Sequence, residues 1–157
     1  MTDWFFIFAA QYLFVFSCII SGLYFFRQEW SERKRIILFA LPSLALAYIL
    51  GLVAAHFYYD PRPFVVDHFI PLIPHAPDNG FPSDHALLVS SIAVIGLYLH
   101  KRLGAVLSVI AVLVMAGRVY VGVHHVIDVV ASVGISLFAT TLVYFLIRFR
   151  EHTKLRT

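Results

Sequence analysis

The stretch WFFIFAAQYLFVFSCIISGLYFF, residues 4–26, contains no charged side chain. About 20 mostly apolar residues suffice for a helix to cross a bilayer, so this stretch predicts a transmembrane helix. The whole chain of 157 residues has the same character, with 61% hydrophobic and 13% charged residues and a mean hydropathy of +0.84. An ordinary soluble domain is about half apolar and about a quarter charged. The composition therefore excludes a disordered chain and indicates a small polytopic membrane protein.

Four further apolar runs follow the first one. They cover residues 36–55, 86–99, 103–117 and 129–147. The run at 86–99 is short, but it extends back to Ser83 if that residue caps the helix. We predict an all-α fold of about five transmembrane helices in one bundle, with residues 1–157 forming a single domain. The single cysteine, Cys18, excludes an internal disulfide and a four-cysteine zinc site.

Basic residues predict the orientation, because Lys and Arg collect in cytoplasmic loops. With five spans, ten of the 12 basic residues fall on one side: Arg27, Arg33, Lys34, Arg35, Lys101, Arg102, Arg148, Arg150, Lys154 and Arg156. We expect that side to be cytoplasmic, with the N-terminus outside and the C-terminus inside. Arg62 and Arg118 are the two exceptions, and a function on the outer face is the natural reason for both.

The predicted outer face gathers polar residues from two segments. The long loop carries Arg62, His68, His75 and Phe81-Pro82-Ser83-Asp84-His85, and the second segment carries Arg118, His124 and Asp128. Arginine forks match phosphate oxygens, and Ser83 begins a helix whose free N–H groups favour an anion. His124 and Asp128 are four residues apart and share a helix face. The carboxylate can therefore hold one imidazole nitrogen and leave the other free to attack. With His85 near the same anion, these are the parts for nucleophilic attack on phosphorus and protonation of the leaving oxygen.

Each of these residues taken alone has a simpler interpretation. Arg62 could be an interfacial anchor, Ser83 only a helix cap, and His85 an interfacial polar residue. His124 and Asp128 could be a helix-stabilising pair or, with His85, ligands of a metal, although the two arginines would repel a cation. The structural or surface interpretation is preferred for the remaining histidines, which are His56, His68, His75, His100 and His125. The joint occurrence favours a function.

The combination resembles the three-part motif of the type 2 phosphatidic acid phosphatase superfamily. Arg62-Pro63 matches the end of Lys-x6-Arg-Pro, Pro82-Ser83-Asp84-His85 matches Pro-Ser-x-His, and Arg118, His124 and Asp128 match Ser-Arg-x5-His-x3-Asp. The motif core covers about residues 58–130. Within the superfamily the chain is most similar to the bacitracin-resistance branch of undecaprenyl-diphosphate phosphatases. Four segments carry that similarity: Tyr59-Asp60-Pro61-Arg62-Pro63-Phe64, Leu72-Ile73-Pro74-His75-Ala76, Phe81-Pro82-Ser83-Asp84-His85 and Tyr120-Val121-Gly122-Val123-His124.

The resemblance implies a role for each matched residue. His124 would be the nucleophile that forms a phosphohistidine, Asp128 would orient it, and His85 would be the general acid. Arg62, Arg118 and Ser83 would hold the phosphoryl group, with no metal and no cofactor. The substrate would be undecaprenyl diphosphate, an isoprenoid lipid phosphate of the bacterial plasma membrane rather than a nucleic acid. Its cleavage to the monophosphate on the outer face would recycle the carrier of peptidoglycan synthesis and oppose bacitracin.

Three departures from the family pattern are visible. Ala55 stands where the family has lysine, with His56 as a substitute and Asp84 as a further auxiliary candidate. Gly117 replaces the serine before Arg118. Family members commonly have six spans rather than five. The alternatives are a phosphatase of phosphatidylglycerophosphate, phosphatidate or lipid A, a non-catalytic anionic-lipid binder or transporter subunit, and a metal-dependent intramembrane hydrolase.

Overall fold

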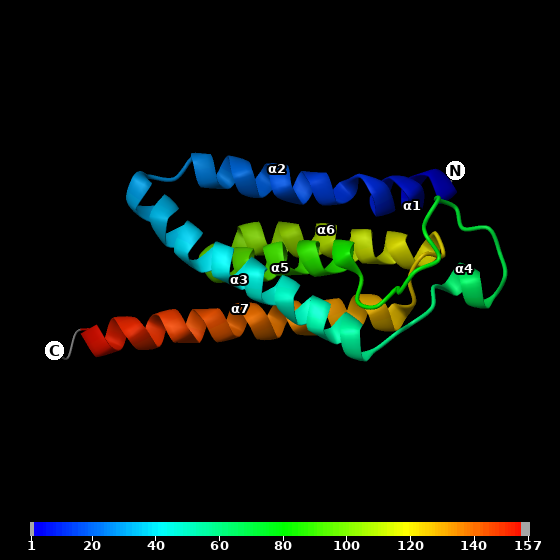
Figure 1. Ribbon diagram of the computed structural model, residues 1–157. Coiled ribbons are helices and arrows are strands. Elements are labelled where there is room, and N and C mark those ends of the chain that lie inside the picture. Colours follow the sequence, from blue (N-terminus) through cyan, green and yellow to red (C-terminus); the bar gives the residue numbers. More distant parts are fainter. Residues whose placement is uncertain (1, 155–157) are drawn as a thin grey trace.

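The helices of the computed structural model, which describes residues 2–154, follow the apolar runs of the sequence (Figure 1). They are α1 (Thr2–Gln11), α2 (Leu13–Phe26), α3 (Trp30–Phe57), α4 (Pro63–Val66), α5 (Asp84–Leu99), α6 (Lys101–Tyr120) and α7 (Val126–Lys154). No strand occurs within these described residues. The predicted all-α class is therefore confirmed.

Three of these helices, α3, α6 and α7, are long and apolar enough to cross a membrane. The first apolar run is a bent pair, because α1 and α2 meet at 50° and together could form a fourth span. The bend falls at Tyr12, whose φ of −124° lies outside the helical region. α5 is apolar but has only 16 residues. A multi-pass helical membrane fold is confirmed, whereas the count of five spans depends on α5 and stays a prediction.

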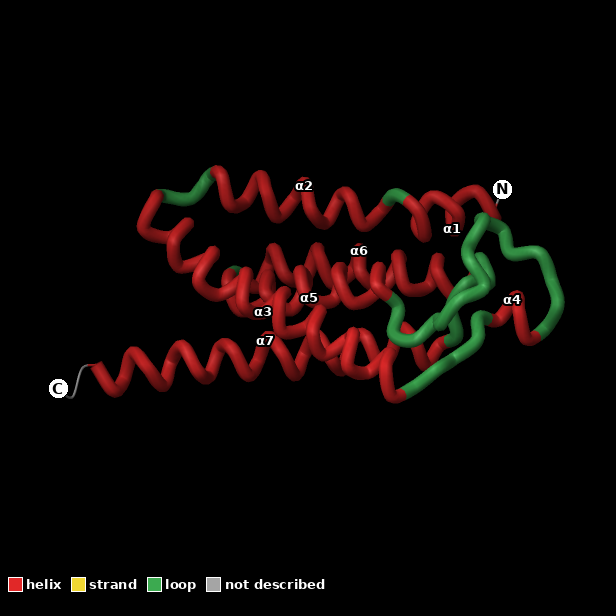
Figure 2. The backbone as a smooth tube through the Cα atoms, in the orientation of Figure 1, coloured by secondary structure: helices red, strands yellow, loops and turns green. Residues whose placement is uncertain are grey.

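The centre of the bundle is the α5–α6 hairpin, which lies between α1–α2 on one side and α3 and α7 on the other (Figures 1 and 2). Its apolar core is a buried cluster of small and branched side chains: Val89, Ala93, Leu107, Ala111 and Val114. Glycine allows the close approach of the two helices. A Cβ on Gly104 would clash with the backbone of Leu97.

Buried serines connect α5 to α7. The Ser136 hydroxyl is 2.9 Å from that of Ser91, and the Ser132 hydroxyl donates to the carbonyl oxygens of Ser83 and Asp128. Such bonds between apolar helices are each worth about 1 kcal/mol. They hold the first turns of α5 and α7 side by side, which places the two motif segments next to each other.

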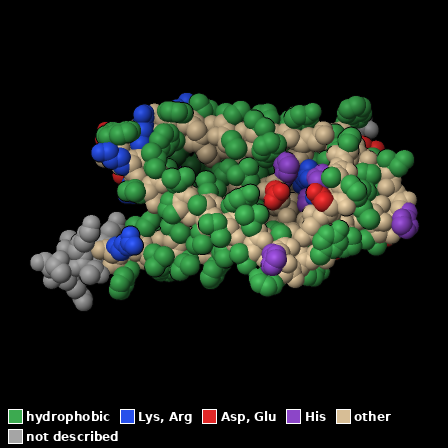
Figure 3. Space-filling model, viewed as in Figure 1, with side chains coloured by type: hydrophobic (Ala, Val, Ile, Leu, Met, Phe, Trp, Pro, Cys, Tyr) green, Lys and Arg blue, Asp and Glu red, His purple; other side chains and the backbone are tan. Residues whose placement is uncertain are grey.

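The two ends of the bundle differ in chemistry. The α2–α3 and α5–α6 connections and the end of α7 lie at one end, and they carry the basic residues that the sequence assigns to the inner side, although Arg156 lies outside the described residues. α4, the long loop and the α6–α7 turn lie at the other end. On the face seen in Figure 3, histidine, acidic and basic side chains gather in one hollow towards that second end.

Candidate active site

His124 lies in the turn between α6 and α7 and is only 3% exposed. Its Nδ1 is 3.0 Å from the carbonyl oxygen of Gly80 and 3.2 Å from Oδ2 of Asp128. Both partners only accept, so Nδ1 carries the proton and donates it to them. Nε2 is 3.3 Å from a terminal nitrogen of Arg62 and 3.3 Å from one of Arg118. Guanidinium nitrogens only donate, so Nε2 is unprotonated and its lone pair accepts from the two arginines.

Arg62 is buried just before α4 and is fixed by three partners besides the histidine. Its Nε donates to Oδ1 of Asp78 over 2.7 Å, Nη1 donates to the carbonyl of Val123 over 2.8 Å, and Nη2 donates to the carbonyl of Asn79 over 3.4 Å. The guanidinium can therefore rotate little. One edge of it stays directed at His124.

Arg118 and Asp128 complete the surroundings of His124, and both keep spare bonding capacity. Arg118 is 4% exposed in the last turn of α6, and its Nε has no partner within residues 2–154. Asp128 is fully buried, and its Oδ2 accepts from the backbone N–H of His125 over 2.8 Å as well as from His124. An anion that enters beside Nε2 can therefore accept further hydrogen bonds from Arg118.

Ser83 occupies the N-cap position of α5, as the sequence predicts, but its side chain makes no capping bond. The hydroxyl is fully buried and has no partner within the described residues. Burying an unpaired hydroxyl is costly, so a ligand that accepts or donates there gains affinity. His85, two residues on, is half-buried with its ring edge-on to Phe14 of α2 at 5.0 Å. Asp84 is exposed at the same helix start.

The charge on His124 is set by opposing influences. Burial lowers the pKa of His124 below its ordinary value, and the two arginines lower it further, while the hydrogen bond to Asp128 raises it. The net result is a neutral imidazole near pH 7. A neutral ring is the form that can act as a nucleophile at Nε2.

The structure explains one departure from the family pattern, Gly117, and shows no part for His56 as a substitute for the missing lysine. His56 is exposed and packs edge-on against Phe57, and within residues 2–154 it makes no hydrogen bond or ion pair to the phosphate-binding arginines. Gly117 lies where α6 meets α1, and a Cβ there would be 2.8 Å from the backbone nitrogen of Ala10. The family's serine would not fit at this position without moving α1.

Asn79 organises the base of the long loop and was not predicted. Its Oδ1 accepts from the backbone N–H groups of Asp60 and Phe81, and its Nδ2 donates to the carbonyls of Ala55 and Tyr58. These four bonds join the two ends of the loop. The sequence does contain a sign of this turn, because Asp78-Asn79-Gly80 is a typical turn sequence.

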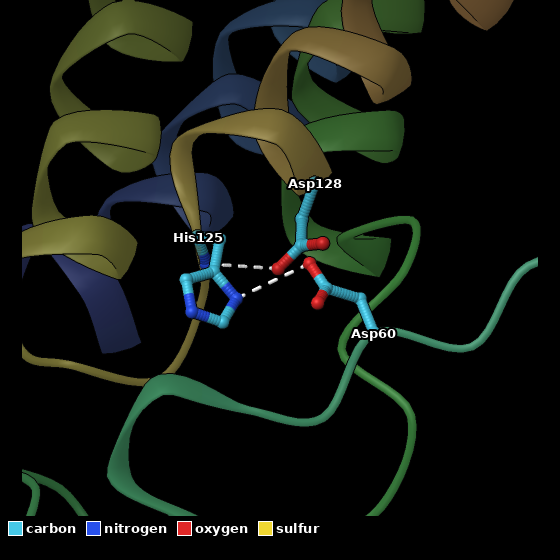
Figure 4. A group of neighbouring side chains, drawn as sticks. All are labelled: Asp60, His125 and Asp128. Carbon is cyan, nitrogen blue, oxygen red and sulfur yellow. Dashed lines mark hydrogen bonds and ion pairs between the residues drawn. The ribbon is translucent and has the colours of Figure 1, made fainter. Parts of the chain in front are cut away.

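Asp60, His125 and Asp128 form a second polar cluster next to the nucleophile (Figure 4). One ligand atom from each lies within 4.8 Å of the others, a spacing compatible with a cation. His85, which the sequence grouped with a metal, is not among them. Nδ1 of His125 is 3.2 Å from Oδ2 of Asp60, and the backbone of His125 bonds Asp128. We interpret the cluster as a bridge between the long loop and α7. Burial and the nearby Asp128 raise the pKa of Asp60, which favours proton sharing within this bridge.

The PAP2 superfamily model matches residues 36–151, and the chain belongs to this superfamily. The resemblance to type 2 phosphatidic acid phosphatases is therefore confirmed. The protein is a multi-pass membrane phosphatase of the class that acts on lipid phosphates.

The chain is similar to three known proteins in sequence or in fold. Undecaprenyl-diphosphatase BcrC of Bacillus subtilis is 30% identical over 135 residues, which cover 83% of this chain and 67% of that protein. Phosphatidylglycerophosphatase B of the same organism is 30% identical over 152 residues, which cover 89% of this chain and 68% of that protein. The crystal structure of Aquifex aeolicus LpxE has the same fold, with a TM-score of 0.72 and 23% identity over 91% of this chain and 85% of that one.

Proposed function

We propose that this phosphatase hydrolyses undecaprenyl diphosphate to undecaprenyl phosphate and inorganic phosphate through a phosphohistidine on His124. The observation that carries the chemistry is the lone pair of Nε2, held between Arg62 and Arg118. A terminal phosphate drawn in by the two guanidinium groups would meet this nitrogen directly. A site for binding alone would need the arginines but no oriented nucleophile.

In the first step, Nε2 of His124 attacks the terminal phosphorus. A P–N bond forms, the P–O bond to the bridging oxygen breaks, and its electron pair leaves with the lipid monophosphate. His85, which takes up a proton when the anionic substrate binds, donates that proton to the leaving oxygen. Arg62, Arg118, the Ser83 hydroxyl and the N-terminal N–H groups of α5 stabilise the charge that develops on the phosphoryl oxygens.

In the second step, water attacks the phosphohistidine. His85, now neutral, removes a proton from the water as its oxygen bonds to phosphorus. The P–N bond breaks and its electron pair returns to Nε2. Inorganic phosphate leaves, and both histidines regain their starting states. Asp128 holds Nδ1–H throughout and stabilises the positive ring.

The similarity to BcrC supports undecaprenyl diphosphate as the substrate. The similarity to phosphatidylglycerophosphatase B makes phosphatidylglycerophosphate the main alternative substrate. The basic connections at the end away from the site support an outer active site in a bacterial plasma membrane, with the N-terminus outside. There the reaction would recycle the carrier of peptidoglycan synthesis and oppose bacitracin.

The test is phosphate release by the detergent-purified protein from four lipids: undecaprenyl diphosphate, phosphatidylglycerophosphate, phosphatidate and lipid A. We expect the highest kcat/KM for undecaprenyl diphosphate, unchanged in excess EDTA. A higher value for another lipid would reassign the substrate. Loss of activity in EDTA, with rescue by one added cation, would replace the phosphohistidine scheme by metal chemistry at the Asp60, His125 and Asp128 cluster.

A further inference from the structure

His75 is a third histidine beside the nucleophile, although the sequence alone favoured a surface role for it. Its ring centroid lies 6.2 Å from that of His124, with the ring planes at 73°. Nδ1 is 3.3 Å from the carbonyl oxygen of Ala76, and Nε2 has no hydrogen bond within residues 2–154. The ring is half-buried. The His75 ring therefore lies at the edge of the proposed phosphate site, and its Nε2 is available to a ligand.

The loop that carries His75 is anchored on both sides of it. Before it, Ile73 is buried against Val121 and Val123, and the N–H of Leu72 donates to the carbonyl of Val121 over 3.1 Å. After it, Asp78 is paired with Arg62. An imidazole between two fixed points loses little further entropy when it binds a ligand.

The electrostatic surroundings of His75 belong to the anion site. The pKa of His75 is lowered by burial first and then by the guanidinium groups of Arg62 and Arg118, while the hydrogen bond to the Ala76 carbonyl and the charge of Asp78 oppose this shift. The ring is thus within electrostatic reach of both phosphate-binding arginines. Nδ1 faces the Ala76 carbonyl, which only accepts, so Nε2 carries a lone pair while the ring is neutral. An incoming anion neutralises the field of the two arginines and favours the protonated ring, which then donates from Nε2.

A diphosphate makes a demand that a monophosphate does not. In the proposed reaction, Arg62, Arg118 and Ser83 hold the phosphate that His124 attacks. Arg62 already donates from Nε, Nη1 and Nη2 to Asp78, Val123 and Asn79. The second, lipid-linked phosphate needs a donor of its own. We propose that His75 binds this lipid-linked phosphate and makes the site selective for lipid diphosphates over lipid monophosphates. The inference rests on the proposed function, and it names His75 as the residue that makes the enzyme selective for lipid diphosphates.

The test compares His75→Asn with His68→Asn on farnesyl diphosphate and farnesyl monophosphate, which share one lipid chain. His68 lies on the same loop, is exposed, and has a φ of 54° that asparagine tolerates. We expect His75→Asn to raise KM for the diphosphate about tenfold, the effect of one charge-assisted hydrogen bond. For His75→Asn, KM for farnesyl monophosphate should stay unchanged. For His68→Asn, KM should stay unchanged for both farnesyl substrates. Unchanged KM values also show that the variants are folded.

A second measurement separates the two proposals. Methylene diphosphonate, which the enzyme cannot cleave, should inhibit monophosphate turnover more strongly than inorganic phosphate does, and His75→Asn should remove that advantage. Equal losses on both farnesyl substrates, or an unchanged inhibitor ratio, would overturn the role of His75. If the wild-type protein cleaves the monophosphate but not the diphosphate, the proposed function fails. The strength of inhibition by methylene diphosphonate relative to inorganic phosphate still decides the role of His75.

Discussion

His124 and His85 have different partners, and this difference predicts different mutant phenotypes. His124 is bound by Asp128 and Gly80 on one nitrogen, whereas His85 packs its ring against Phe14. His124→Ala should abolish the covalent phosphoenzyme and turnover together. His85→Ala should slow formation of that intermediate about 10²–10⁴-fold with a lipid diphosphate, the usual value of general acid catalysis. An activated aryl phosphate needs little protonation as it leaves and should lose less.

Rapid-quench trapping of an acid-labile, base-stable phosphoenzyme measures both effects. The wild-type protein is the positive control in each experiment. A phosphoenzyme that persists in His124→Ala, or disappears only in His85→Ala, would show that the two roles are reversed.

The charge state of His124 predicts the acid side of the pH profile. Because the pKa of His124 lies below its ordinary 6.5, Nε2 stays unprotonated as the pH falls through 6.5. The acid limb of kcat/KM should therefore have its midpoint below pH 6.5. Asp128 raises this pKa, so Asp128→Asn should move the limb to still lower pH while it reduces the rate at neutral pH. A shift of the limb to higher pH would contradict this electrostatic account.

At the scale of the helices, the contact between α1 and α6 explains a missing hydroxyl. Gly117→Ser restores the residue of the family motif, but its Cβ would lie 2.8 Å from the backbone nitrogen of Ala10 and 3.1 Å from the carbonyl of Phe6. We expect no gain in activity and a loss of stability of about 1–3 kcal/mol, as for other overpacked sites. Thermal unfolding in detergent measures this loss.

Gly134→Ser is the matched control for that substitution. Gly134 lies on the exposed face of α7, and a Cβ there would meet nothing within 4 Å. The chemical change and the helical setting are the same, so any propensity effect appears in both variants. Equal stability of Gly117→Ser and Gly134→Ser would mean that α1 shifts away from the new side chain at little cost in free energy.

The apolar runs predicted the helices well because burial in lipid requires continuous apolar sequence. The ends of α6 lie close to its run at 103–117, whereas α3 begins at Trp30, before its run at 36–55. The 50° bend at Tyr12 could not be predicted, because no proline or glycine marks it. The motif spacing predicted that Arg62, Arg118, His124 and Asp128 belong together, and their distances agree. The orienting carbonyl of Gly80 and the position of His75 depend on how a long loop folds back, which side-chain pattern alone does not encode.

At the scale of the whole molecule, the separation of basic residues from the site predicts the topology. With Cys18→Ser as background, Val66→Cys places an exposed thiol at the end of α4, and Lys101→Cys places one at the opposite end of the bundle. An impermeant maleimide should label the first in intact cells and the second only after permeabilisation. The reverse pattern would put the site on the cytoplasmic face and exclude direct processing of an outer-leaflet carrier.

The four bonds of Asn79 also separate the base of the long loop from its middle. The base, at residues 60–62 and 78–81, carries Arg62 and the Gly80 carbonyl and is closed by the asparagine itself. Residues 64–77 between them meet the α6–α7 turn, where Ile73 is buried, the Leu72 N–H donates to the Val121 carbonyl and the His75 ring lies beside that of His124. We therefore expect an exchange of this middle portion to change which substrate binds, through His75, while Arg62 and the Gly80 carbonyl stay in place around His124.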